Sequence, residues 1–329
     1  MMHLCCLQGK SHVILPSRMT HRIFLSVLCS AVCFAASAFA APTPNQAQLK
    51  NDLETVYNTW RQHMIRENYD GWQKTTAAYR KVKVRNLAVS EKRPWPQSLF
   101  NQQISPPSLL PLRYIGTVVK GPTAAATYFG KVDWGIGGAP SENAYVLLFT
   151  NERGEWKYDQ ARFFNLAQLP KVRERLRNHD TSVLEEQDGF QPLGTVPPVP
   201  VVCPVPQYIG KIFVDCPGRT VKARINNVSD HVFEDARMAE VISGGLRNGV
   251  NTIDLSISPA PGGKPGPLAV MVYVMPETVG NFPGLAYSYT VPADQTGTSG
   301  PTTFTITPDT IRHMAPQFHK KETSEAAKK

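Results

Sequence analysis

The chain has 329 residues, 42% of them hydrophobic, and a formal net charge of +9. This length and apolar content exclude a disordered chain and favour two folded domains. The positive charge lies in the first half, because residues 41–180 carry 20 Lys and Arg against 12 Asp and Glu, whereas residues 181–329 carry 12 against 14.

Residues 1–40 have the pattern of a secretory signal peptide with a spurious N-terminal extension before Met19. An apolar run at residues 23–36 is followed by Ala38-Phe39-Ala40, the small-x-small pattern of a cleavage site. We therefore expect cleavage between Ala40 and Ala41, and export of a bacterial protein to the periplasm or the medium. The apolar run is shorter than a membrane-spanning helix requires, so we expect no transmembrane segment after cleavage. We also expect no nucleic-acid partner for an exported protein.

Residues 41–182 are expected to form one domain that begins with helices. Apolar residues from Leu49 to Met64 recur at spacings of three and four, which predicts a helix of about five turns. A second helical pattern runs from Asp70, a candidate N-cap, to Arg85, and residues 97–101 predict one more turn. A solvated helix face explains the basic residues on and after this second helix better than an anionic partner surface does. These residues are Arg80, Lys81, Lys83, Arg85, Lys92 and Arg93.

Four strands are predicted after the helices, at residues 112–119, 124–132, 144–150 and 155–164. The third is a continuous apolar run, which indicates a strand covered on both faces. In the fourth, the successive Phe163 and Phe164 break the two-residue alternation, which predicts a bulge or a bend. Helices followed by a curved antiparallel sheet make an α+β domain.

The second half of the chain is expected to be all β. Residues 183–206 are rich in proline and predict an extended, semi-rigid linker. Seven short strands at residues 207–309, several of them separated by Gly-rich turns, predict an antiparallel β-sandwich that resembles an immunoglobulin-like domain. Residues 310–329 form a charged tail.

The order of elements in residues 41–182, with Trp156-Lys157-Tyr158-Asp159 late in the domain, resembles the nuclear transport factor 2-like superfamily, which has a cystatin-like cone fold. That superfamily includes ketosteroid isomerase, scytalone dehydratase and many non-enzymatic pocket proteins. The resemblance implies a cavity between the sheet and the first helix. Its candidate wall residues are Trp60, Tyr128, Trp156 and Tyr158. Because large aromatic residues are more often core than ligand cage, the alternative is that these side chains fill the cone.

Enzymes of the cone fold that transfer protons need an ionisable group in the cavity whose pKa is set by burial. Asp159 and Tyr128 are the weak catalytic candidates, and Asp159 can face inward only if the strand bulge falls there. The sequence has no phosphate loop, nucleophile elbow or zinc spacing. We therefore expect no cofactor and no metal, and we interpret His231, Glu234 and Asp235 as a polar loop.

Cys203 and Cys216 are the cysteines that remain after removal of the leader. In an oxidising compartment their closeness in sequence favours a disulfide, which would stabilise the fold by about 3 kcal/mol. The alternative is two buried free thiols.

Two functions remain open. The leading one is an exported, non-catalytic binding or scaffold protein of the cell envelope, with a small apolar ligand in the cone and an envelope protein or glycan on the sandwich. The other is a cone-pocket enzyme of the isomerase, dehydratase or hydrolase type. A homodimer formed through the sheet face is a further expectation.

Overall fold

The structure is a computed structural model that describes residues 45–101, 105–132, 141–166, 169–185, 189–277 and 282–312. The leader, the expected cleavage between Ala40 and Ala41, and the charged tail beyond residue 312 lie outside these residues. The described residues belong to one compact unit, Pro44–Lys329. They form a few helices and three antiparallel sheets, with more strand than helix. No helix within the described ranges is both long and apolar enough to cross a membrane.

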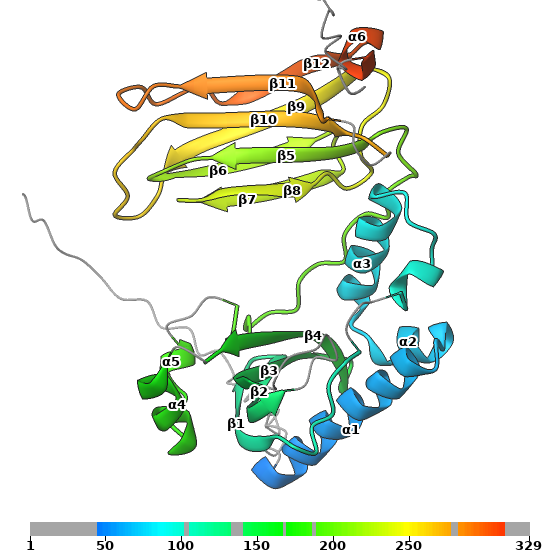
Figure 1. The fold of residues 1–329 in the computed structure, drawn as a ribbon, viewed down its shortest axis with the longest axis vertical. Coiled ribbons are helices and arrows are strands. Elements are labelled where there is room, and N and C mark those ends of the chain that lie inside the picture. The colour runs from blue at the N-terminus through cyan, green and yellow to red at the C-terminus, as the bar shows by residue number, and fades with distance from the viewer. Residues whose placement is uncertain are drawn as a thin grey trace, which may run out of the picture. The chain divides into compact units, whose positions relative to one another are not determined.

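The first half begins with a long helix, α1 (Gln46–Ile65), as the apolar spacing predicts (Figure 1). Its N-cap is Asn45, whose side chain accepts a hydrogen bond from the Ala47 amide. The buried stripe of α1 consists of Leu49, Leu53, Tyr57 and Met64. The other helices of this half are α2 (Tyr69–Thr75), α3 (Ala78–Ser90), the 3-10 turn η1 (Gln97–Leu99), α4 (Pro170–Arg177) and α5 (Ser182–Glu185).

The second predicted helix is divided into α2 and α3. Thr76 lies between them with an extended backbone and forms a parallel bridge with Tyr158. The Ala77 amide also donates to the Tyr158 carbonyl at 2.8 Å. The helix ends here because the chain pairs with a strand edge, a tertiary contact that helical spacing does not reveal. Asn68, and not Asp70, caps α2.

The strands of the first half form an antiparallel sheet in the order β1-β2-β3-β4. The bounds are Arg113–Lys120, Thr123–Val132, Ser141–Glu152 and Glu155–Asn165. In β4 the register with β3 shifts at Asp159, and not at Phe163 and Phe164 as expected, because Phe149 lies opposite Tyr158 and Leu148 opposite Gln160. This bulge leaves the two successive residues Tyr158 and Asp159 both buried.

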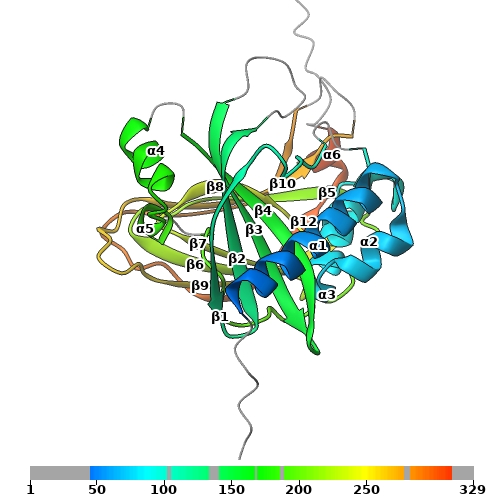
Figure 2. The same cartoon turned by 90° about the horizontal axis from the view of Figure 1, so that it is seen from below.

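Apolar side chains cover both faces of this sheet. On one face α1 crosses the strands and encloses a core with them (Figure 2). On the other, Leu176 of α4 and Leu184 of α5 pack on residues such as Val146. The apolar run of β3 is therefore buried throughout, as its sequence predicts. The sheet face through which a homodimer was expected carries the chain's own helices.

The second half contains two four-stranded antiparallel sheets, in the orders β11-β10-β5-β8 and β12-β9-β6-β7. Apolar residues from both sheets form one shared core. The strands are β5 (Ile209–Asp215), β6 (Arg219–Ile225), β7 (Ser229–Glu234), β8 (Arg237–Val241), β9 (Gly249–Pro259), β10 (Leu268–Met275), β11 (Gly284–Val291) and β12 (Gly300–Ile306). A short helix, α6 (Pro308–Arg312), follows β12.

One strand, β7, lies where a polar loop was expected, so that interpretation was wrong. Ser229, His231 and Phe233 are buried and alternate with exposed residues along β7. The inward side chains at two of these three positions are polar, and hydrophobic alternation therefore did not reveal the strand.

The predicted disulfide between Cys203 and Cys216 is not formed, and both cysteines are buried free thiols. The thiol of Cys203 lies 3.6 Å from the Ser90 hydroxyl, whereas the thiol of Cys216 contacts the Ala236 carbonyl at 3.4 Å. Strand β5 separates the two cysteines in sequence. Cys203 lies beside Gly244, near the start of β5, whereas Cys216 follows the end of β5 and pairs with Ala236. A strand of seven residues is about 20 Å long at roughly 3.3 Å per residue, while a disulfide needs Cα atoms within about 7 Å.

Candidate functional site

The four aromatic residues expected to line a cone cavity are packed against one another or against neighbouring core residues. Tyr128 and Tyr158 are buried in the core between α1 and the sheet, and Trp60 and Trp156 pack against that core. The ring centroids of Trp60 and Tyr158 are 4.0 Å apart. Tyr57 joins the same group, with its hydroxyl 3.2 Å from that of Tyr145. These aromatic side chains therefore fill the space between α1 and the first sheet.

The two weak catalytic candidates contact different helices. The Tyr128 hydroxyl donates to Glu54 of α1 at 3.1 Å, and burial raises the pKa of this phenol well above its usual range. Asp159 instead accepts a hydrogen bond at 2.8 Å from Nε of Arg80 on α3. Because each group has its own partner on a separate helix, the structure does not bring them together as an acid and base pair.

A pocket of about 660 Å³ lies beside Arg80. It is bounded by α3, the segment of β4 that follows the bulge, the proline-rich connector, and residues at β6 and at the start of β7. Its charged lining residues are Arg80, Lys83, Arg162, Arg224 and Asp230. Its apolar wall is the connector, with Leu193, Pro197, Pro198, Val199, Pro200 and Val201. The volume is in the range that small-molecule sites occupy in proteins.

Asp159 fixes the position of Arg80 at this pocket. Its side chain is 4% exposed and its carboxylate pairs with Arg80, whose side chain is 16% exposed. Burial raises the pKa of Tyr79, and a hydrogen bond to Asp159 raises it further. A guanidinium and a phenol that line the pocket thus share one buried carboxylate, which holds both in place.

The connector wall is held to α3 by hydrogen bonds. The Asn86 side chain donates to the Val201 carbonyl at 2.7 Å and accepts from the Cys203 amide at 3.1 Å. Arg85 donates to the Cys203 carbonyl at 2.9 Å. Ser90, which is fully buried, accepts from the Gly244 amide at 2.8 Å. Asn86 therefore anchors one end of the apolar wall on the helix that carries the cations.

A second polar arrangement links the two sheets of the second half. Nε2 of His231 lies 2.7 Å from the Ser229 hydroxyl, and Nδ1 lies 2.6 Å from the carboxylate of Glu240 on β8. The hydrogen bond from His231 is the main reason that the pKa of Glu240 is lowered, and Lys83 adds to it. Ser229 is only 2% exposed and also accepts from the Ser243 amide, so a substrate cannot reach its oxygen. These hydrogen bonds join the edges of the two sheets.

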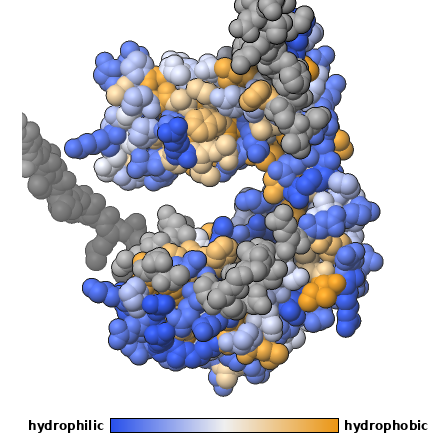
Figure 3. Space-filling model, viewed as in Figure 1, coloured by the Kyte–Doolittle hydropathy of each residue, from blue (hydrophilic) through white to orange (hydrophobic). Residues whose placement is uncertain are grey.

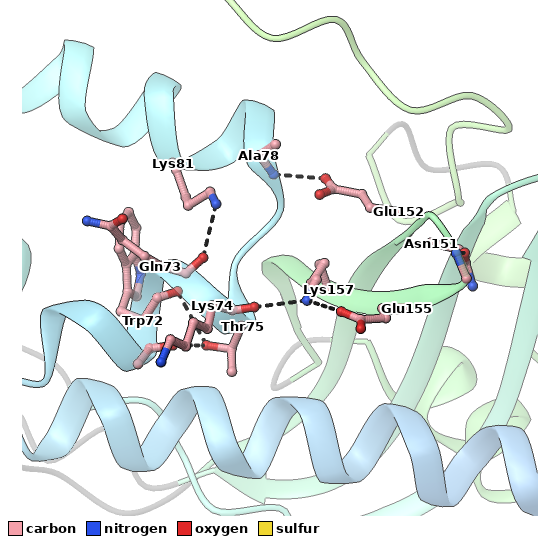
Figure 4. A network of polar contacts seen from close by, with 12 residues as sticks. Trp72, Gln73, Lys74, Thr75, Ala78, Lys81, Asn151, Glu152, Glu155 and Lys157 are labelled. Atoms are coloured by element: carbon pink, nitrogen blue, oxygen red, sulfur yellow. Dashed lines mark hydrogen bonds and ion pairs between the residues drawn. The ribbon is translucent and has the colours of Figure 1, made fainter.

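A third polar network surrounds the break between α2 and α3 (Figure 4). Glu152, in the β3–β4 hairpin, accepts from the Ala78 amide at 2.8 Å and so caps α3. Lys157 donates to the Lys74 carbonyl and pairs with Glu155. These contacts tie the hairpin to the helices, so we assign the network to the fold. Among the residues that the structure describes, no group of three or more His, Cys, Asp or Glu could hold a metal.

Sequence reasoning noted two of the pocket's cations but interpreted them as a solvated helix face, so it did not predict the pocket. Arg80 and Lys83 belong to the basic group noted on the second helix. On the face drawn in Figure 3, hydrophilic residues predominate and hydrophobic residues form patches among them. Arg162 and Arg224 were missed, because they lie on strands that are distant in sequence from the basic group of the second helix. Other members of the basic group have structural contacts: Lys81 binds the Gln73 carbonyl, and Lys92 pairs with Glu277 at 2.5 Å.

Comparisons with known proteins add little to this geometry. No family model and no curated protein matches the chain. Among solved structures, a chain of Extended-Synaptotagmin 2 that comprises its SMP domain and two C2 domains is 10% identical, with 79% of this chain and 69% of that chain covered and a TM-score of 0.14. A likeness at this TM-score carries no argument about fold or function.

Proposed function

We propose that this chain is an exported, non-catalytic binding protein of the bacterial envelope, with its ligand site in the pocket between α3, β4 and the connector. In this proposal the first half is a nuclear transport factor 2-like cone and the second an immunoglobulin-like sandwich. The helix-then-sheet order and the two sheets that share one core support these assignments. The leader pattern of residues 1–40 supports export.

The observation that carries the proposal is the contrast between the cone and the pocket. The candidate cone residues pack in or against an aromatic core, with ring centroids as close as 4.0 Å. The pocket beside α3 instead has about 660 Å³ of open volume. We therefore move the ligand site from the cone interior, where the sequence led us to expect it, to this pocket.

The test is recovery of a bound molecule. The protein is expressed with its leader, purified from the envelope or periplasmic fraction, and extracted for mass spectrometry. We expect a molecule that co-purifies with the wild type and is lost in Leu193→Trp, whose indole would occupy the pocket, since Leu193 lines it and is 56% exposed. Leu169→Trp, at an exposed site outside the lining, should retain it. Equal recovery from both variants, or no molecule from the wild type, would contradict the proposal.

A further inference from the structure

Cationic side chains outnumber carboxylates at the pocket. Arg80 is paired with Asp159, and Arg224 lies 3.4 Å from Asp230, with both of these side chains largely exposed. Lys83 and Arg162 are exposed, and within the described residues no carboxylate lies at ion-pair distance from either. The pocket thus carries two cations without an ion-pair partner in the described part of the chain.

The connector wall of the pocket is apolar, in contrast to the charged side chains on the other walls. The connector contributes valine and proline side chains, and proline lacks a backbone N–H to offer a ligand. The side chain of Val199 is 56% exposed and that of Val201 is 67% exposed, so water covers apolar surface here in the absence of a ligand. A ligand that buried this surface would gain from the hydrophobic effect.

We propose that the pocket binds a free organic anion, with a carboxylate, phosphate or sulfonate held by Arg80, Lys83 and Arg162 and an apolar body lying on the connector wall. This inference rests on the proposed function, to which it adds the ligand class. Arg80 is the anchor, because Asp159 holds it through Nε and leaves its terminal nitrogens for the ligand. Lys83 and Arg162 supply the charge that the ligand neutralises. A volume of about 660 Å³ suits a single small molecule.

Two fluorescent probes with the same aromatic body test the inference on the protein from Ala41 to Lys329. 1-Anilinonaphthalene-8-sulfonate carries an anionic group, and N-phenyl-1-naphthylamine is the neutral molecule without it. We expect one saturable site for the sulfonate, with at least tenfold weaker binding of the amine. Lys83→Gln and Arg162→Gln should each weaken sulfonate binding by roughly tenfold, the size of one charge-assisted hydrogen bond, and leave amine binding unchanged. Lys222→Gln removes an exposed cation outside the lining and is the matched control.

The possible results separate the inference from the proposed function. If the two probes bind equally and both are lost in Leu193→Trp, the pocket binds ligands but the anion inference is wrong. If the sulfonate binds equally well to Lys83→Gln, Arg162→Gln and the control, the inference is also wrong. Decanoate should displace the sulfonate, and phosphatidylglycerol vesicles should not sediment the protein. Sedimentation without displacement by decanoate would indicate a membrane surface as the partner and overturn the inference.

Discussion

At the scale of single residues, Asp159 fixes the position of Arg80 at the pocket. The bulge in β4 turns this carboxylate inward, toward Arg80 and Tyr79 on α3. Sequence reasoning anticipated that Asp159 could face inward at a bulge, but it could not show which helix would meet it. A buried carboxylate is costly without partners, so the side chains of α3 determine its role.

We expect Asp159→Asn to destabilise the protein by roughly 3 kcal/mol, because the largely buried Arg80 would lose its counter-charge. Urea unfolding followed by circular dichroism measures this. Asp230→Asn, which breaks the exposed pair with Arg224, should cost less than about 1 kcal/mol. If Asp159→Asn costs no more than Asp230→Asn, the anchoring role of Asp159 is wrong.

The tyrosines buried between α1 and the first sheet predict a loss of stability at alkaline pH. Burial raises the pKa of Tyr145 to about 12 and those of Tyr57, Tyr128 and Tyr158 above it. Because a tyrosine in the unfolded chain ionises near pH 10, folding favours the protonated phenols. Their contribution to the free energy of unfolding is complete below about pH 10 and is lost as the pH rises through the pKa values of the folded protein. Absorbance at 295 nm should show late ionisation of these groups together with unfolding. Ionisation of all tyrosines near pH 10 in a folded protein would mean that this core is open to water.

Cys203 and Cys216 predict two free thiols in the protein from Ala41 to Lys329. Each is buried, and the two have separate partners in the fold. We expect two thiols to react with Ellman's reagent under denaturing conditions, and the melting temperature to be the same with and without reductant. A protein with no titratable thiol would contradict the separation of the two cysteines.

At the scale of elements, the sequence predicted most helices and strands but not their irregularities. α1, the four strands of the first sheet and seven of the eight later strands follow from spacing and turn residues. The break at Thr76 and strand β7 were missed, because the first depends on pairing with Tyr158 and the second has polar side chains facing inward. The pocket was also missed, because residues that are distant in sequence line it.

The connector differs most from its sequence-based prediction, because hydrogen bonds hold it against α3. A free proline-rich linker would be open to proteases, but Asn86 holds this one at the Val201 carbonyl and the Cys203 amide. We expect Asn86→Ala to increase the rate of elastase cleavage at residues 199–202 by several-fold relative to the wild type. Asn51→Ala, on the exposed side of α1, is the control and should leave the rate unchanged. Rapid cleavage of the wild type at these residues would show that the connector is not anchored.

At the scale of the whole molecule, the two halves of the chain contribute different parts of one proposed site. The first half supplies Arg80, Lys83 and Arg162, and the connector supplies the apolar wall. The second half adds Arg224 and Ser243, and the amide of the neighbouring Gly244 donates to the Ser90 hydroxyl. The excess of basic residues in the first half of the sequence is therefore, in our proposal, the origin of the charge at the ligand site.

Nuclear magnetic resonance of the protein from Ala41 to Lys329, titrated with 1-anilinonaphthalene-8-sulfonate, tests the location of the site most directly. We expect shifts in the backbone amides of Lys83, Arg162 and Val199, and unchanged indole signals from Trp60 and Trp156. Shifts of these two indoles, with the amides of α3 and the connector unaffected, would place the ligand between α1 and the first sheet and contradict the proposed site.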